Sequence, residues 1–260
     1  KTEEEPETKP EEKPETKPEE KPETKPEGSA GEPPAAAPDD EKAVAKLKEL
    51  GAELEQDYRG VVVAVEAINT KITDDDLALL AGFPSLEILK IDGGAVTAEG
   101  TVHLKGLKQL VRLYLDDVEL ADDALANLSG LANLEVLSLK KTGITGAGLV
   151  HLEPLAKLCV LHLSGNAVDD DGLSHVEKLT NIDTLALPDT KVTGAGLVHL
   201  KPLSRLRVLN LDGCAITNES LESLSGLENL RMLHVHRSKV TGEGVGEFKE
   251  KMPGLAVYYQ

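Results

Sequence analysis

Aromatic residues are almost absent from this sequence. Phe, Tyr and Trp together make up 2% of its 260 residues, and Trp does not occur. Any hydrophobic core must therefore be built from aliphatic side chains. Long apolar runs are also lacking, because none approaches the roughly 20 residues that a membrane-spanning helix needs. We therefore expect no membrane insertion of this chain.

Basic residues and cysteines are also scarce. The 28 basic residues are outnumbered by 46 acidic ones, which gives a formal charge of −18. A surplus of this sign argues against nucleic acid or an anionic membrane surface as a partner. The two cysteines, Cys159 and Cys214, lie far apart in the sequence. We therefore expect free thiols rather than a disulfide framework.

Leucine, in contrast, recurs at a regular interval of 24 residues. The positions that begin the interval are Leu86, Leu110, Leu134, Leu158, Ile182, Leu206 and Leu230. Each is followed by leucine three positions later and by another aliphatic residue five and ten positions later. A weaker copy begins at Val62. This pattern, LxxLxLxxxxI, predicts a solenoid of stacked repeats.

Each repeat is expected to hold one strand and one short helix. The alternation around the third and fifth positions predicts a strand with its leucines inward. Residues suited to cap a helix then share one position: Thr73, Thr97, Thr145, Asp169, Thr193, Thr217 and Thr241. Acidic residues follow them, where the helix dipole favours negative charge. Because packed helices need more space than paired strands, the sheet should form the concave side of a horseshoe.

The first part of the chain differs in composition from the repeats. Residues 1–38 are rich in Pro, Glu and Lys, so we expect a disordered linker that serves as a tether. Residues 39–58 carry apolar residues at spacings of three and four, which predicts a helix capping the first repeat. Residues 59–260 form the predicted repeat domain.

The unit LxxLxLxxTxITGAGLVHLxPL occurs almost intact at 134–155 and 182–203. It resembles the ribonuclease-inhibitor-like class of leucine-rich repeats, and most closely its 24-residue bacterial versions. The resemblance implies an α/β leucine-rich-repeat horseshoe, with a parallel sheet on the concave side and short helices on the convex side. It also implies a binding scaffold, mostly for other proteins, rather than an enzyme.

The concave face is the set of side chains two, four and six positions after the start of each repeat. Its aliphatic strip with a polar rim is typical of an interaction surface. The predicted partner-binding residues are Arg112, Tyr114, Val136, Ser138, Val160, His162, Asn210, Asp212, Met232, His234 and His236. His234 and His236 lie two apart on one predicted strand, and so point to the same face beside Asn210 and Asp212. Alternatively, these side chains only stabilise the sheet.

Other candidate chemistry has a structural explanation. His103, His151, His175 and His199 share one helix position, which the repeat consensus explains better than a metal ladder does. The acidic runs at 74–76 and 169–171 lack the spacing of a calcium loop. Neither a GxSxG motif nor a phosphate-binding loop occurs. We therefore assign no catalytic, cofactor-binding or metal-binding residue.

The sequence thus predicts a non-enzymatic scaffold that binds a protein partner on its concave face and is held on a flexible tether. One alternative is a structural or cell-envelope spacer without a specific ligand. A less favoured one is a metal-binding protein or enzyme that uses Asp212, His234 and His236. We expect a monomer that binds no nucleic acid and needs no cofactor. An exported or envelope-tethered location is expected, with the cytoplasm as the alternative.

Overall fold

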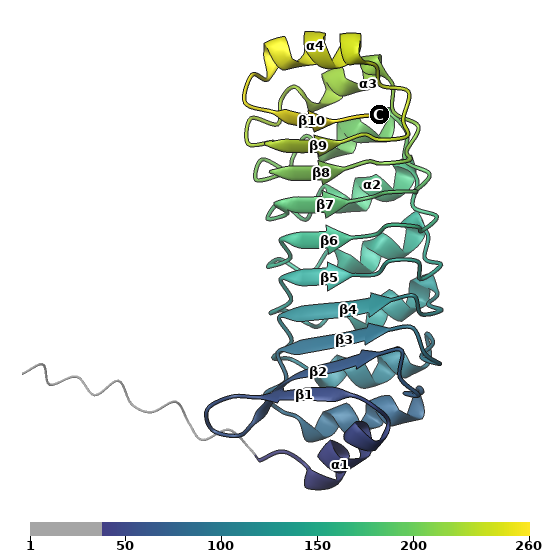
Figure 1. The fold of residues 1–260 in the computed structure, drawn as a ribbon, viewed down its shortest axis with the longest axis vertical. Helices are drawn as coiled ribbons and strands as arrows, with labels where there is room; N and C mark the ends of the chain where they lie inside the picture. The colour runs from purple at the N-terminus through teal and green to yellow at the C-terminus, as the bar shows by residue number, and fades with distance from the viewer. Residues whose placement is uncertain (1–37) are drawn as a thin grey trace, which may run out of the picture. The chain divides into compact units, whose positions relative to one another are not determined.

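The computed structural model describes residues 38–260, so the linker predicted over 1–38 lies, except for Pro38, outside the described residues. The described part contains an open sheet of ten strands that follow one another in chain order (Figure 1). The strands are β1 (Glu53–Gln56), β2 (Val62–Ile68), β3 (Ile88–Asp92), β4 (Arg112–Asp116), β5 (Val136–Ser138), β6 (Val160–His162), β7 (Thr184–Ala186), β8 (Val208–Asn210), β9 (Met232–His234) and β10 (Ala256–Tyr258).

Strands β2 to β10 are parallel, and each paired residue lies 24 positions from its partner on the next strand. Leu89 pairs with Leu113, for example, and Leu113 pairs with Leu137. The same offset holds at both ends of the parallel region. Each repeat therefore contributes one strand, and equivalent side chains of successive repeats stand in rows across the sheet.

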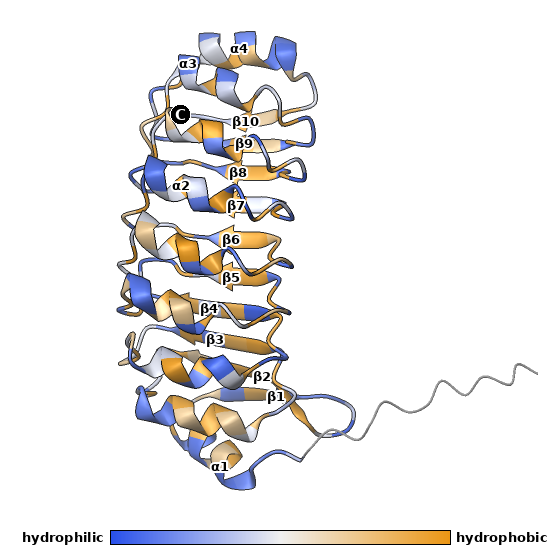
Figure 2. Cartoon of the chain, turned by 180° about the vertical axis from the view of Figure 1, so that it is seen from behind, coloured by the Kyte–Doolittle hydropathy of each residue, from blue (hydrophilic) through white to orange (hydrophobic). Residues whose placement is uncertain are grey.

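The helices lie together on the other side of the sheet (Figure 2). After α1 (Glu41–Glu49), the helices are η1 (Asp75–Gly82), η2 (Gly100–Gly106), η3 (Asp122–Asn127), η4 (Gly146–Leu152), α2 (Asp170–Val176), η5 (Gly196–Leu200), α3 (Asn218–Leu221), η6 (Glu222–Leu224) and α4 (Gly242–Lys251). Those marked η are short 3₁₀ segments. Within each repeat of 24 residues the chain must leave one strand, cross behind the sheet and return to begin the next strand. Few residues remain for the helix, so it is short.

The core between the two layers is aliphatic, as the composition predicts. The leucines that begin the repeats and those at the third and fifth positions are buried throughout; Leu113, Leu137 and Leu161 have no exposed surface. The α/β solenoid predicted from the periodicity is therefore confirmed, with its sheet on one side and short helices on the other.

Small polar residues satisfy the backbone where each strand turns towards its helix. Asn166 is buried, and its side-chain oxygen accepts hydrogen bonds from the backbone N–H groups of Thr142 and Gly143, each 3.0 Å long. Its amide group donates to the carbonyl oxygens of Leu139 and Leu163. A backbone turn can therefore be buried here without leaving donors and acceptors unpaired.

The N-terminal element differs from the predicted 39–58 helix. Helix α1 ends at Glu49, Gly51 follows with a φ of 95°, and residues 53–56 form β1, which pairs antiparallel with β2. Tyr58 lies in the connecting turn with 89% of its surface exposed, rather than on a buried helical face. A left-handed glycine ends the helix and allows the chain to reverse. A helix and an edge strand thus cover the first repeat together.

The acidic residues near the helix starts have a role that the dipole argument did not predict. The Asp122 carboxylate accepts hydrogen bonds from the backbone N–H of Thr145, at 2.7 Å, and from its hydroxyl group, at 2.6 Å. We call such a pair an Asp–Thr clasp. Equivalent clasps join Asp74 to Thr97 and Asp170 to Thr193, and Asn218 replaces the aspartate against Thr241.

The Asp–Thr clasps recur every 48 residues, which is twice the repeat length. Each clasp joins one repeat to the next, and the following pair of repeats has its own clasp. Gly148, three residues after Thr145, lies where the Asp122 side chain passes: a Cβ atom there would be 2.7 Å from Asp122 Oδ1. The same crowding occurs at Gly100, Gly196 and Gly244. A T-x-x-G sequence therefore marks every second repeat, because only glycine admits the side chain of the preceding repeat.

The threonine column caps the helices only in part. Thr145, Asp169, Thr217 and Thr241 are helix N-caps, as predicted. In the repeats of Thr73, Thr97 and Thr193 the N-cap is a later residue, namely Asp74, Glu99 and Ala195. Thr97 and Thr193 instead contribute to the Asp–Thr clasps.

Replacing Leu137 by alanine should lower the free energy of unfolding by roughly 2–5 kcal/mol, because a fully buried leucine leaves a cavity. Denaturant unfolding followed by circular dichroism measures the change. Val102 is the control, since it is 47% exposed on the helix side, and Val102→Ala should change the free energy by less than about 0.5 kcal/mol. Equal losses in the two variants would contradict the assigned core.

Removing an Asp–Thr clasp should cost less than removing a core leucine. Asp122→Ala is expected to lower the free energy of unfolding by roughly 1–2 kcal/mol, because two hydrogen bonds to a partly exposed carboxylate are lost. Asp122→Asn should retain most of the stability, since Asn218 already fills this role against Thr241. Asp123→Ala, at an exposed neighbouring residue, is the control. If Asp122→Ala destabilises no more than Asp123→Ala, the clasp does not contribute to stability.

Candidate functional site

The strand register places nine of the predicted partner-binding residues in two adjacent rows on the concave face, while Asp212 and His236, at the sixth position, follow the ends of β8 and β9. Residues at the second position, from Arg112 on β4 to Met232 on β9, form one row. Those at the fourth position, from Tyr114 to His234, form the other. Alternate residues of a strand point to opposite faces, so burying the leucines leaves these rows facing away from the core.

Most of these side chains are half-buried against their neighbours. Arg112 and Met232 are exposed, and Met232 keeps 39% of its surface accessible. Val136, Val160 and Val208 lie half-buried between them, and Thr184 of β7 separates Val160 from Val208 in the row. The side chains of this face are therefore packed against one another, because each contacts those of the adjacent strands.

Ser138 is the exception, and its predicted contact with a partner is wrong, because it has no exposed surface. Its hydroxyl group donates a 2.7 Å hydrogen bond to Asp116 Oδ1. The same carboxylate accepts the backbone N–H of Lys140 at 2.9 Å, and its other oxygen lies 3.2 Å from Lys140 Nζ. Ser138 thus belongs to a polar cluster, with Asp116 and Lys140, that links two repeats. Within this cluster Ser138 is not accessible to a partner.

His162 lies beside this cluster on β6, half-buried on the concave face. Burial lowers the pKa of its imidazole below 6.5, and the positive charge of Lys140 lowers it further, while Asp116 acts in the opposite direction. Both burial and Lys140 therefore favour the neutral imidazole at this position.

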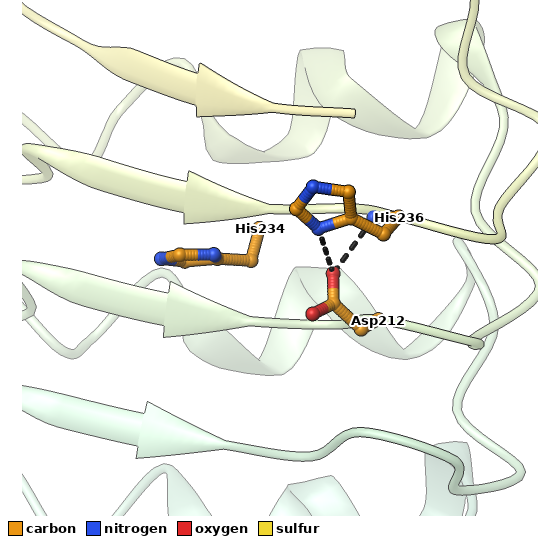
Figure 3. Close-up of side chains that lie close together, drawn as sticks. All are labelled: Asp212, His234 and His236. Atoms are coloured by element: carbon orange, nitrogen blue, oxygen red, sulfur yellow. Dashed lines mark hydrogen bonds and ion pairs between the residues drawn. The ribbon is translucent and has the colours of Figure 1, made fainter. Parts of the chain in front are cut away.

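The C-terminal end of the concave face holds a second cluster, made of Asp212, His234 and His236 (Figure 3). Asp212 Oδ1 accepts the backbone N–H of His236 at 2.7 Å and lies 3.0 Å from its Nδ1. The His234 ring stacks on Tyr258 of β10, with ring centres 4.5 Å apart. The sequence correctly predicted that these two histidines and Asp212 lie close together.

Some charged pairs between repeats were not predicted. Arg237 forms an ion pair with Asp189 at 2.9 Å across two repeats, and both residues are more than half exposed there. The Asp116–Lys140 pair spans one repeat. Opposite charges spaced by 24 or 48 residues were a signal for such pairs, because the register aligns equivalent positions of adjacent repeats and a long side chain can reach one repeat further.

On the helix side, two of the four aligned histidines contact a glutamate of the preceding repeat. His175 Nδ1 lies 2.9 Å from Glu153, and His199 pairs with Glu177 in the same way. The pKa of Glu153 is lowered by its hydrogen bond with Lys178 and by that with His175. These contacts join successive helices, which agrees with the structural explanation of the histidine column.

Protonation of His162 should destabilise the fold. Because burial depresses its pKa, the unfolded chain takes up this proton at a higher pH than the folded chain does. The stabilisation by His162 is therefore complete above the unfolded pKa and is lost as the pH falls through the folded pKa. The free energy of unfolding should thus fall between about pH 7 and pH 5 less steeply in His162→Gln than in the original chain.

Denaturant unfolding at several pH values measures this difference, and NMR titration reports the imidazole directly. Val150→Ala, at an exposed residue on the helix side, is the control and should leave the slope unchanged. A measured pKa for His162 at or above that of an unstructured peptide would contradict the burial argument.

Comparison with known proteins agrees with the architecture. A family model described as leucine-rich repeat matches residues 156–175 and 204–225. Internalin C2 of Listeria monocytogenes is structurally similar, with a TM-score of 0.62 and 24% identity over 76% of this chain. The plant peptide hormone receptor RGFR1, solved in complex with RGF2, has a TM-score of 0.52 and 16% identity over 80% of this chain. Curated proteins gave no significant sequence match.

The similarity covers different shares of these proteins. This chain spans 81% of the internalin C2 chain but 36% of the receptor chain. A leucine-rich-repeat protein of Leptospira interrogans is also similar, with a TM-score of 0.54 and 20% identity over 69% of this chain and 44% of that one. At these identities the similarity establishes the fold. With the repeat pattern, the parallel sheet and the helical outer layer, it shows that this chain is a leucine-rich-repeat protein of the α/β horseshoe type.

Proposed function

We propose that this chain is a non-enzymatic scaffold that binds a protein partner on its concave face. The observation that carries the proposal is the alignment on one face of two rows of side chains, from Arg112 to Met232 and from Tyr114 to His234. The aliphatic residues of the first row are supported from behind by the sheet. A partner can bury apolar area against such a surface and form hydrogen bonds with its polar groups, while the core stays covered.

The two ends of the concave face provide the best anchors. Tyr114 and Arg112 lie together on β4, and both residue types are enriched among interface residues that contribute most of the binding energy. Met232 and His234 lie at the other end, on β9. Tyr and Arg bury a large area and keep a polar group for hydrogen bonding.

The fold neighbours support an interaction function. RGFR1 was solved with the peptide hormone RGF2, and another plant receptor, GASSHO1/SCHENGEN3, was solved with CASPARIAN STRIP INTEGRITY FACTOR 2. Both are leucine-rich-repeat proteins seen with a ligand, so the architecture accommodates binding. We extend this from their fold to the present chain as part of the proposal.

The hydrogen bonds of the described residues also favour a scaffold over an enzyme that uses a nucleophile. In the 38–260 part of the chain, the histidine side-chain hydrogen bonds go to carboxylates and none goes to a serine or cysteine. The buried Cys214 instead contacts Thr190 and the Leu187 carbonyl oxygen. Burial raises the pKa of the Cys214 thiol, which disfavours the reactive thiolate.

We further propose that residues 1–38 hold this scaffold on a tether in an exported or envelope-attached protein. The composition of the segment, rich in Pro, Glu and Lys, supports a tether role. Among residues 38–260, no helix is both long enough and apolar enough to cross a membrane.

Substitutions on the concave face should weaken binding while the fold stays intact. With the 1–260 chain as bait, a recovered partner should bind Tyr114→Ala or Met232→Ala at least about tenfold more weakly, a loss of about 1.4 kcal/mol. Isothermal titration calorimetry measures the affinity, and circular dichroism confirms folding.

The matched control removes apolar surface from the helix side. Val102, Val150 and Val198 are each at least 40% exposed there, and replacing all three by alanine should leave the affinity unchanged. If the valine variant loses binding and the concave variants retain it, the partner binds the helix side. If the unsubstituted 1–260 chain recovers no partner, the spacer alternative is favoured.

A further inference from the structure

The cluster of Asp212, His234 and His236 is not explained by the repeat. The equivalent residues four repeats earlier are Asp116, Ser138 and Lys140. There the aspartate accepts the backbone N–H of Lys140, as Asp212 accepts that of His236. The aspartate thus has the same structural role in both places. The two imidazoles are additional, because a serine and a lysine satisfy the same backbone arrangement.

The three side chains converge on one region of the concave face. Figure 3 shows His234 at the end of β9 and Asp212 and His236 just after β8 and β9, with the His236 ring next to the Asp212 carboxylate and the His234 ring to its left. Each offers one ligand atom, and these atoms all lie within 4.8 Å of one another. Tetrahedral zinc with bonds of 2.0–2.1 Å requires ligand atoms about 3.3 Å apart. Small side-chain rotations are therefore sufficient to close the site.

Each of the three side chains is held by a neighbour. Asp212 is fixed by the backbone N–H of His236, and His236 is oriented by Asp212. His234 is stacked on Tyr258 at an interplanar angle of 14°. Orientation of the ligands before the ion arrives lowers the ordering cost of binding. The contacts of Asp212 with protein groups use Oδ1, and its Oδ2 accepts no hydrogen bond from residues 38–260.

We propose that Asp212, His234 and His236 bind one divalent transition-metal ion, with zinc(II) as the best fit. Two imidazole nitrogens and one carboxylate oxygen form a ligand set that suits zinc, and imidazole disfavours magnesium and calcium, which prefer oxygen ligands. The side chain of Asp212 is 20% exposed and that of His236 is 38% exposed. The fourth coordination position therefore faces solvent on the concave face, where water or a ligand from another molecule completes the shell.

This proposal depends on the three side chains and not on the partner-binding function. A metal ion here adds a positive charge at the end of the concave face, between residues of the last two repeats before β10. It also links the repeats that contain β8 and β9 through side chains. Zinc should therefore stabilise the chain, because an ion that binds only the folded state shifts the unfolding equilibrium.

The test uses the full 1–260 chain, purified without a polyhistidine tag and treated with a chelator. Isothermal titration with zinc chloride should show one ion bound per chain, and zinc should raise the melting temperature. Cobalt(II) should give the visible absorption of a four- or five-coordinate ion. Calcium and magnesium should give neither binding heat nor a shift in melting temperature.

Variants assign the binding to these residues. His234→Gln and His236→Gln should each weaken zinc binding at least about tenfold, and the double variant should abolish the cobalt absorption. The control replaces His175 and His199 by glutamine, because each is also paired with a carboxylate but lies on the helix side. The control should retain the affinity of the original chain.

Two results would overturn the proposal. One is the absence of zinc binding by the original chain at concentrations of tens of micromolar. The other is binding that persists in the His234→Gln, His236→Gln double variant or disappears in the helix-side control. Because both sets of substitutions are at partly exposed side chains, circular dichroism should show an unchanged fold in each variant. The cobalt spectrum of the original chain tests coordination without any substitution.

Discussion

No repeat of this chain has a core of its own, and this constraint governs the rest of the structure. Leu137 is buried only because Leu113 and Leu161, its neighbours in the same row, cover it on either side. A parallel register of 24 residues meets the requirement, because it places like side chains beside like ones at every step. The ends need separate solutions: α1 and the antiparallel β1 at one end, and α4 with β10 at the other.

The same constraint leaves the concave face free to carry chemistry. Burying Leu113 and Leu115 directs Arg112, Tyr114 and Asp116 to the opposite face, whatever their identity. The two polar clusters show how far that freedom extends. The Asp116 and Asp212 carboxylates make the same bond to the next repeat, yet one cluster contains a lysine and the other contains two histidines. Binding properties can therefore change at this face without a change in the core.

The helix side follows a different rule, because its repeats are joined in pairs. An Asp–Thr clasp needs an acceptor in one repeat, a threonine in the next and a glycine three residues after that threonine. Asp122, Thr145 and Gly148 show the full arrangement. Acidic residues that seemed to serve only the helix dipole thus connect neighbouring repeats, and part of the net negative charge has a structural origin.

The sequence alone determined the solenoid, the strand positions, the buried rows and the face on which Tyr114 and His234 lie. These features follow from the burial of apolar side chains, and the apolar residues recur in the sequence with a period of 24. Tertiary structure decided what depends on contacts between repeats: the burial of Ser138 under Asp116, the turn at Gly51 that replaces a longer helix, and the clasp between Asp122 and Thr145. A hydrophobic pattern contains no information on side-chain rotamers or on the offset between neighbouring helices. Hydrogen bonds between residues 22 to 24 positions apart form only once stacking has set both.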